Sequence, residues 1–187
     1  MLNLAYPLKN KVTIDNKEYD LDLSFDNVLK LFDMLEDELL SDVMKIEVGL
    51  EMLINDTLDD YHIREKEKVF YEIFKAAIGG GVEDNQPVDI AGNPMPSNNE
   101  EVNYSLKEDA EYIYASFMSD YGIDLIEQQG KLHWYKFKAL LGGLTDGSKF
   151  VKVLEIREME LPKGKGSGKQ REHIKKLKKQ YELKGNN

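Results

Sequence analysis

Residues 132–144 read LHWYKFKALLGGL, and the way this stretch is buried decides which fold the chain can have. Three aromatic side chains lie within four residues, beside one histidine and two lysines. On a helix the large side chains form two apolar sides, one made of Trp134, Phe137 and Leu141 and the other of Leu132, Tyr135 and Ala139. A helix with two apolar sides contacts two neighbours. The stretch therefore predicts a central core helix packed between helices over residues 105–121 and 148–160, and the alternative is an exposed binding face.

The composition favours a cytosolic globular protein. The 187 residues suit one domain of ordinary size, and a hydrophobic share of 41% is enough for a real core. The absence of cysteine excludes disulfides and cysteine-ligated zinc sites and is typical of a cytosolic chain. The residues after Met1 lack the apolar core of a signal peptide, and no run approaches the roughly 18 apolar residues of a membrane-spanning helix. We therefore expect a cytoplasmic protein without a membrane partner.

Charge is distributed unevenly along the chain. Residues 161–187 carry nine lysines and arginines and two glutamates, a net charge of +7. The whole chain carries −10, so residues 1–160 carry −17. The acidic part is expected to repel nucleic acid, whereas the basic tail is expected to attract nucleic acid, an acidic partner or the acidic part of its own chain.

Local patterns predict a hairpin followed by helices. Residues 11–23 alternate apolar and polar side chains around turn residues at 15–17, which predicts a small β-hairpin. Such a hairpin is too small to be stable alone and must pack on helices. Three segments then carry apolar residues at helical spacing, and they run over residues 25–39, 42–54 and about 61–78.

Composition changes at residues 79–104, where glycine, proline and polar residues dominate and an exposed loop is expected. Helical spacing resumes over residues 106–121 and 149–160, with Gly122 ending the first of these helices and a short helix or turn at 123–129. Serines that can cap helices precede three of the predicted helices: Ser24, Ser105 and Ser148. For Ser105, a glutamate three residues later, Glu108, completes the pattern of a capping box. The predicted fold class is mainly α: a helical domain with a small N-terminal β-hairpin and a flexible basic C-terminal tail.

The basic tail divides from the rest at about residue 162. Residues 1–162 are predicted to form an acidic helical body, and residues 163–169, KGKGSGK, a flexible linker. Residues 171–184 place Ile174, Leu177 and Tyr181 at spacings of three and four, which predicts a short amphipathic helix. The candidate partner-binding residues of this tail are Lys175, Lys176, Lys178, Lys179 and Tyr181. With one aromatic residue to stack on bases, nucleic-acid binding is less favoured than contact with a protein, contact with the chain itself or solubility alone.

No motif points to catalysis. The three histidines, His62, His133 and His173, lie far apart and in no metal-ligand spacing such as HExxH. A solvated loop position is expected for His62, with a metal site beside Asp59 or Asp60 as the weaker alternative, and a hydrogen-bonded, half-buried position is expected for His133. The glycines and lysines of GKGSGK do not match the pattern of a phosphate-binding loop, and no GxSxG elbow occurs. We predict no catalytic residue, no metal site and no cofactor.

The order of three segments resembles one phage protein family. They are DAEYIYASFMSDYGIDLIE at 109–127, LHWYKFKALLGGL at 132–144 and SKFVKVLEIREMEL at 148–161, followed by the basic tail. This order resembles the tail-gene family of siphophages and prophages of Gram-positive bacteria that carries a numbered gp-fifteen name. The resemblance covers residues 11–162 and is most specific at 112–158. The residues chosen as the core of the family motif are Tyr121, Gly122, Leu132, Trp134, Tyr135 and Phe137.

The resemblance implies a non-enzymatic tail assembly chaperone. Such a protein is helical, tends to form homo-oligomers, binds the tape-measure protein and helps to recruit tail-tube subunits in the cytoplasm of the bacterial host. It leaves before the virion is complete. The rival interpretations are a structural phage protein, such as a minor tail or head–tail connector component, and a nucleic-acid-binding regulator that uses the basic tail. An enzyme comes last, because no catalytic residue is predicted.

Overall fold

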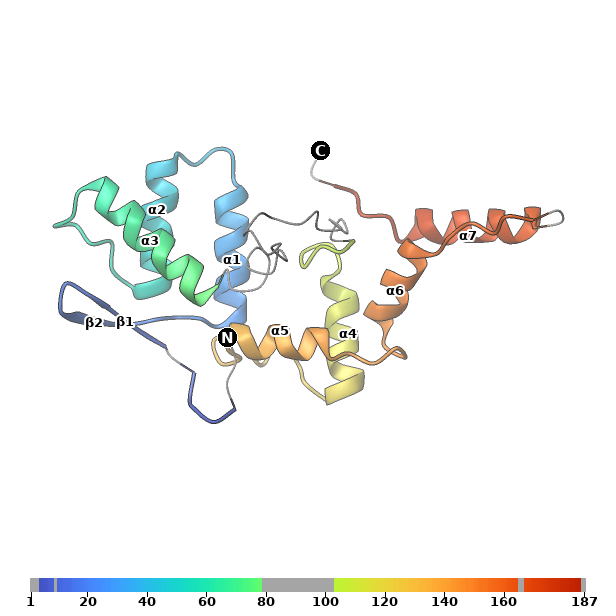
Figure 1. Ribbon diagram of the computed structural model, residues 1–187, viewed down its shortest axis with the longest axis horizontal. Helices are drawn as coiled ribbons and strands as arrows, with labels where there is room; N and C mark the ends of the chain where they lie inside the picture. The colour runs from blue at the N-terminus through green and yellow to red at the C-terminus, as the bar shows by residue number, and fades with distance from the viewer. Residues whose placement is uncertain (1–3, 9, 79–102, 165–166, 186–187) are drawn as a thin grey trace, which may run out of the picture. The chain divides into compact units, whose positions relative to one another are not determined.

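The computed structural model describes residues 4–8, 10–78, 103–164 and 167–185. In these residues the chain forms one two-stranded hairpin and seven helices, so the prediction of a mainly α fold with an N-terminal hairpin is confirmed (Figure 1). The loop predicted over residues 79–104 falls mostly on residues 79–102, which lie outside the described residues.

The hairpin consists of β1, Lys11–Ile14, and β2, Lys17–Asp20. The strands are antiparallel, with Val12 opposite Tyr19 and Ile14 opposite Lys17. The two turn residues, Asp15 and Asn16, both have positive φ, at 45° and 65°. This turn matches the right-handed twist of the strands, and Asp and Asn tolerate the left-handed region better than most residues do. The predicted hairpin is therefore confirmed, but its turn comprises residues 15–16 rather than 15–17, and β2 ends at Asp20 rather than at residue 23.

Three helices follow the hairpin: α1, Phe25–Glu36, α2, Asp42–Ile54, and α3, Ile63–Ala77. The first ends three residues earlier than predicted. The Asp37 carboxylate accepts a hydrogen bond from the backbone N–H of Leu39 at 2.9 Å, and this local turn competes with continued helix. Ser24 does not cap α1 with its side chain, because its hydroxyl donates to the carboxylate of Asp22 at 2.6 Å.

Residues 132–144 are part of the core, as predicted, but their neighbours differ from the prediction. Helix α5, Trp134–Gly142, begins at the tryptophan, which is 4% exposed. Its indole lies 5.6 Å from the ring of Phe32 in α1 and 5.7 Å from that of Phe137, measured between centroids. A backbone bridge causes this placement: Trp134 N–H donates to Leu23 O at 2.7 Å, and Phe25 N–H donates to Leu132 O at 2.9 Å. The helix predicted to pack between the 105–121 and 148–160 helices therefore packs on α1 at Trp134, whereas at its other end Leu140 O accepts a hydrogen bond from the Tyr121 hydroxyl of the 105–121 helix.

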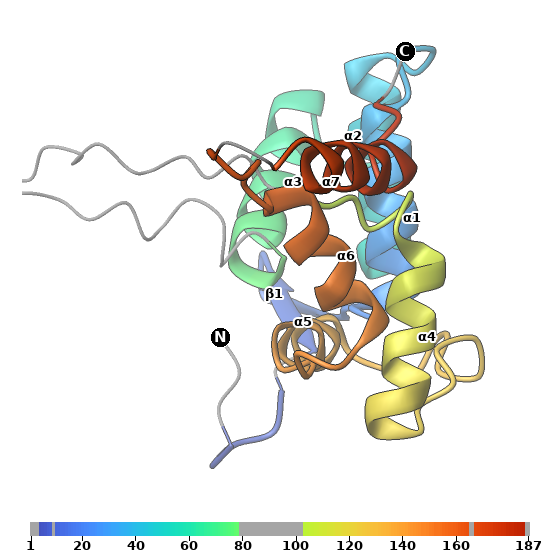
Figure 2. The same cartoon turned by 90° about the vertical axis from the view of Figure 1, so that its right-hand side faces the viewer.

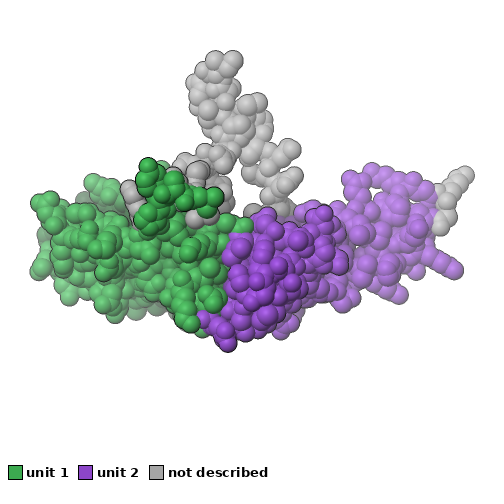
Figure 3. All heavy atoms as spheres, turned by 90° about the horizontal axis from the view of Figure 1, so that it is seen from below, with its two compact units in different colours: residues 1–97, 128–139 green, residues 98–127, 140–187 purple. Residues whose placement is uncertain are grey.

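The chain divides into two compact units, coloured separately in Figure 3. Unit 1 comprises residues 1–97 and 128–139, and unit 2 comprises residues 98–127 and 140–187. The core of unit 1 includes Val28 and Leu31 of α1 and Leu50 and Leu53 of α2, all fully buried. The core of unit 1 is therefore complete only when the stretch near residue 134 packs against α1.

Unit 2 is built from α4, Ala110–Tyr121, α6, Lys149–Glu158, and α7, Gly168–Gln180, in addition to the last turn of α5 (Figure 2). Its buried centre contains Phe117 of α4 and Val153 of α6. Gly122 ends α4 with a φ of 64°, as predicted, and the Ser148 hydroxyl accepts from Val151 N–H at the start of α6.

Three details of unit 2 differ from the sequence predictions. Helix α7 begins at Gly168, inside the linker predicted over 163–169, and ends at Gln180, four residues before the predicted end at 184. Residues 106–109 form a turn, and α4 begins only at Ala110. The Ser105 hydroxyl accepts from Glu108 N–H at 3.2 Å, but the carboxylate that reaches back to Ser105 N–H is that of Asp109, at 3.0 Å, and not that of Glu108. Residues 125–130 form turns, which agrees with the predicted short helix or turn.

Candidate functional site

The residues chosen as the core of the family motif serve mainly to hold the fold. Trp134, Phe137 and Leu132 are buried in unit 1. In unit 2, the Tyr121 hydroxyl donates to Leu140 O at 2.9 Å, and Gly122 provides the left-handed end of α4. Tyr135 is half-buried, and its hydroxyl donates to Ala76 O of α3 at 3.0 Å.

His133 occupies the hydrogen-bonded position that its sequence context predicts. Its Nδ1 accepts from the backbone N–H of Tyr135 at 3.0 Å and so caps the start of α5. Burial, together with the positive charge of Lys136, lowers the pKa of His133 below its usual value of 6.5. Within the described residues, its Nε2 and the indole N–H of Trp134 have no hydrogen-bond partner. A buried neutral imidazole with a structural acceptor is poorly placed to act as a general base.

A groove in unit 1 is the first candidate interaction site. It has a volume of about 880 Å³, which lies within the range of about 300–1,000 Å³ typical of ligand sites. One wall is the whole of β1, and the other is a face of α3 that includes Val69, Ile73 and Ala77. The lining is completed by residues 6–8, Asp15, Leu21, Leu23, Tyr61 and Tyr135. Sequence reasoning predicted the hairpin and the helix but not the space between them.

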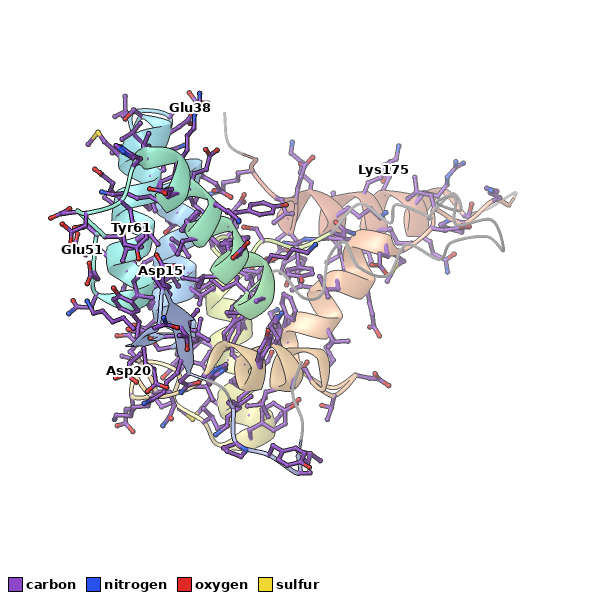
Figure 4. All side chains as sticks on the ribbon, turned by 60° about the vertical axis from the view of Figure 1, so that its left-hand side comes forward. Asp15, Asp20, Glu38, Glu51, Tyr61 and Lys175 are labelled. Atoms are coloured by element: carbon purple, nitrogen blue, oxygen red, sulfur yellow. The ribbon has the colours of Figure 1, made fainter. Side chains whose placement is uncertain are left out.

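Tyr61 and Asp15 fix one end of this groove. The Tyr61 hydroxyl donates to the Asp15 carboxylate at 2.6 Å, and the two side chains lie side by side in Figure 4. This hydrogen bond, with a smaller contribution from desolvation, raises the pKa of Tyr61 to about 12. The bond ties the hairpin turn to the segment that leads into α3.

Acidic side chains dominate the surface of unit 1. Its described residues contain 18 carboxylates and 11 lysines and arginines, a net charge of −7. Asp20, Glu38 and Glu51 are examples that project outward in Figure 4. Such a field favours basic partners and disfavours phosphate backbones.

The second candidate site is the basic face of α7 in unit 2. Lys175, Lys176 and Lys179 are exposed and Lys178 is half-buried, and none of the four forms a salt bridge within the described part of the chain. A hollow of about 520 Å³ beside them is lined by Lys175, Lys178, Lys179 and Arg157, with one carboxylate, Glu182. The structure therefore brings three of the four predicted lysines together around one hollow, and Lys176 is not part of its lining.

Tyr181, the fifth predicted partner-binding residue, contacts its own unit. Its ring lies 5.8 Å from that of Tyr112 between centroids, and the Lys149 ammonium lies 4.9 Å from the Tyr181 centroid. Lys149 Nζ also donates to the Tyr181 hydroxyl at 3.0 Å. The tail was expected to contact nucleic acid, an acidic partner or its own chain, and in the structure Tyr181 of the tail contacts its own chain. The ring is therefore not free to stack on a nucleic-acid base.

Sequence reasoning missed the buried ion pair that supports this contact. Arg157 Nη1 and Nη2 donate to the two carboxylate oxygens of Asp109 at 2.7 and 2.6 Å. The same guanidinium donates through Nε to Tyr181 O at 2.6 Å. Its hydrogen bonds to Asp109 raise the pKa of Arg157 above its usual value. A signal was present, because Asp109 and Arg157 each lie four residues from a buried apolar residue, Ile113 and Val153 respectively.

The remaining polar clusters do not form a metal site in the described residues, where no group of three or more His, Cys, Asp or Glu side chains could hold an ion. At the start of α3, His62 N–H donates to the Glu65 carboxylate at 2.9 Å.

None of the helices among the described residues is both long enough and apolar enough to cross a membrane.

Comparison with protein families gives one match. The family model described as Bacteriophage Gp15 protein matches residues 5–183. Comparisons with curated proteins and with solved structures found no match. The match covers most of the 187 residues, so the chain belongs to the Bacteriophage Gp15 protein family, and the resemblance noted in the three sequence segments is confirmed at this level.

Proposed function

We propose, from the premise of membership in the Bacteriophage Gp15 protein family, that this phage protein is a tail assembly chaperone. It binds the tape-measure protein and helps to recruit tail-tube subunits, without catalysis. The observation that carries the proposal is the match over residues 5–183, because it covers both compact units.

The two candidate surfaces support this role. Unit 1 carries a groove with apolar walls in an acidic setting, whereas unit 2 carries a basic helix whose lysines have no salt-bridge partner in the described residues. Surfaces of opposite charge suit a protein that holds two different partners, or several sites on one long partner, through weak contacts whose avidity adds. Homo-oligomer formation is part of the proposal, because acidic and basic surfaces on one chain can also pair between copies.

Co-expression tests the proposal. The tape-measure protein of the same phage is expressed in a bacterial host alone, with the wild-type chain and with a chain in which Lys175, Lys176 and Lys179 are changed to Glu. The wild-type chain should keep the tape-measure protein in the soluble fraction and co-elute with it on size exclusion, and the charge-reversed chain should do so less. Equal insolubility of the tape-measure protein with and without the wild-type chain would contradict the proposal.

The second candidate is a structural phage protein, such as a minor tail or head–tail connector component, which the family match also favours. Mass spectrometry of purified virions separates the two. A chaperone that leaves before completion should be absent from the virion, whereas a structural component should be present in fixed copy number. A nucleic-acid-binding regulator is disfavoured, because unit 1 is acidic and Tyr181 is already packed against Tyr112.

A further inference from the structure

Strand β1 has one paired edge and one free edge. A two-residue turn makes its flanking residues, Ile14 and Lys17, a hydrogen-bonded pair, and such pairs alternate along an antiparallel ladder. The hydrogen bond from Leu21 N–H to Asn10 O at 2.7 Å continues this alternation. Lys11 and Thr13 therefore direct their N–H and C=O groups away from β2. Within the described residues, these four backbone groups have no hydrogen-bond partner outside the hairpin.

The free edge of β1 opens into the groove of unit 1. Five consecutive residues, Lys11 to Asp15, line the groove, although successive side chains of a strand point to opposite faces. No residue of β2 lines it. Because it touches every residue of β1 and none of β2, the groove runs along the edge of β1, and it also reaches Leu21 and Leu23, which follow β2. The groove thus has the geometry of strand addition, with unpaired backbone groups on one wall and a helix, α3, on the other.

The side chains around this edge define what an added strand must carry. Val12 and Ile14 are the half-buried and buried residues of β1, and the apolar wall of α3 that includes Val69 and Ile73 lines the same groove. An added strand would direct alternate side chains toward that wall, so those side chains should be apolar. The intervening side chains would share the outer face of the sheet with Thr13.

The negative charge of unit 1 indicates which residues suit the outward-facing positions of the added strand. The described residues of unit 1 carry a net −7. The two lysines that line the groove are already matched, since Lys11 binds Glu18 at 2.6 Å and Lys68 lies 4.0 Å from Glu72. Lysine or arginine at the outer positions of the added strand therefore complements the field around the groove.

We propose that the groove between β1 and α3 binds an extended segment of a partner protein as a third strand paired to β1. The segment has apolar side chains at alternate positions, facing α3, and basic side chains between them. The inference goes beyond the chaperone role because it specifies a binding mode. The experiment that tests it uses no phage partner, so its outcome is independent of the co-expression result.

The probe is a fluorescein-labelled, end-blocked nonapeptide of alternating valine and lysine, titrated with the full chain and followed by fluorescence anisotropy. Saturable binding is expected. Two further peptides carry backbone N-methyl groups, one on every lysine and the other on every valine. Methylation removes donors from one edge of the peptide only, so one of these two peptides should bind at least tenfold more weakly and the other within about twofold of the parent. Equal binding by all three peptides would overturn the proposal.

Matched protein variants test the same edge. Thr13→Pro removes an outward N–H from β1 but no bond to β2, and proline is tolerated on edge strands. Asp20→Pro removes an outward N–H from β2, on the edge that does not line the groove, and keeps the 2.6 Å ion pair of Lys11 with Glu18. Binding should weaken at least tenfold in Thr13→Pro and stay within about twofold in Asp20→Pro. Equal effects of the two substitutions would contradict strand addition at β1.

Hydrogen exchange of the unsubstituted chain keeps the test valid if a proline variant unfolds. The bound peptide should slow exchange of the Lys11 and Thr13 amides at least tenfold, whereas the Ile14 amide, already paired with β2, should change little. Two outcomes would overturn the proposal. Equal binding of a peptide of the same composition with valines at helical spacing would indicate that the groove holds a helix. Protection of the Thr13 amide that rises with protein concentration alone would indicate that the groove holds a second copy of the chain.

Discussion

Arg157 donates two parallel hydrogen bonds, of 2.6 and 2.7 Å, to the carboxylate of Asp109, and this pair joins the end of α6 to the start of α4. Asp109 is fully buried, and the Arg157 side chain is 6% exposed. Water therefore has little access to either charge and cannot fully replace the partner of either. The Arg157 guanidinium also donates to two backbone carbonyl oxygens, Tyr181 O and Asn103 O.

Replacement of Asp109 by Ala should destabilise unit 2 severely. The substitution leaves the Arg157 guanidinium buried without its counter-charge, and breaking such a pair costs about 3–5 kcal/mol of unfolding free energy. Urea unfolding followed by circular dichroism measures the loss. The exposed pair Lys11–Glu18 provides the control, because Glu18→Ala should leave the unfolding midpoint nearly unchanged. A midpoint in Asp109→Ala equal to that of the control would show that the buried pair is not needed.

Trp134→Ala should also be costly, for a different reason. The indole packs against Phe32 and Phe137, so its removal loses transfer free energy and leaves a cavity. The expected loss is about 3–5 kcal/mol. Thermal unfolding followed by circular dichroism tests this, with Tyr71→Ala, at a 65% exposed position, as the control. Wild-type stability in Trp134→Ala, combined with loss of partner binding, would mean that the aromatic stretch is an exposed interface.

The periodic parts of this fold were predictable because their signal is local. Apolar spacing and turn residues such as Asp15 and Asn16 depend on nearby sequence only, so the hairpin and helices were predicted within a few residues. The predicted helix ends were wrong where a carboxylate accepts a hydrogen bond from a nearby backbone N–H, as at Asp37 and Asp109. These choices depend on geometry that periodicity does not contain.

The non-local parts were not predictable from the same signals. The bridge between Leu23 and Trp134 joins residues more than a hundred positions apart, and no pattern in either segment identifies the other. Asp109 is one of 35 carboxylates and Arg157 one of 25 lysines and arginines, so spacing alone does not pair them. The groove beside β1 exists only once the hairpin has packed near α3, and it therefore had no sequence signature.

His133 should make the stability of unit 1 depend on pH. Burial lowers the pKa of His133 in the folded chain, so below about pH 6.5 the unfolded chain binds the proton more readily. The His133 contribution to the unfolding free energy is therefore present above pH 6.5 and is lost as the pH falls from there through the folded pKa. His133→Asn keeps a capping acceptor but does not titrate, so its unfolding free energy should fall less between pH 7.5 and 5.5 than that of the wild type.

Urea unfolding at pH 7.5, 6.5 and 5.5 measures this difference. His173→Asn, at an exposed position in α7, removes a histidine from outside unit 1 and serves as the matched control. The carboxylates whose pKa is lowered, such as Asp120, titrate below 3.8 and so lie outside this range. Parallel pH dependence of wild type and His133→Asn would show that His133 has the same pKa in the folded and unfolded chains.

Tyr181 should hold the end of α7 against unit 2. Its ring contacts Tyr112, and its hydroxyl and carbonyl oxygen accept hydrogen bonds from Lys149 and Arg157. Tyr181→Ala removes the ring and the hydroxyl, so α7 should separate from the unit more often and trypsin should cut sooner after Lys175, Lys176, Lys178 and Lys179. Mass spectrometry of a trypsin time course measures these cuts, with Tyr71→Ala as the control. Unchanged cleavage rates would show that Tyr181 does not restrain the tail.

Four of the lysines of α7, Lys175, Lys176, Lys178 and Lys179, should drive self-association that salt abolishes. Their ammonium groups form no salt bridge within the described residues, whereas the described part of unit 1 carries −7. The tail of one copy is therefore expected to lie on unit 1 of another at low salt. Exposed charges are screened beyond about 8–10 Å at physiological ionic strength, so the association should fade as salt is added. Light scattering of the full chain at low and high salt measures this effect.

Two comparison chains test whether the basic tail causes the association. One consists of residues 1–162, which lack the tail, and the other is a full chain with Lys175, Lys176 and Lys179 changed to Glu, which keeps Tyr181 in place. Both should stay monodisperse at low salt where the wild type assembles, and if either assembles as the wild type does, the basic tail has no part in self-association.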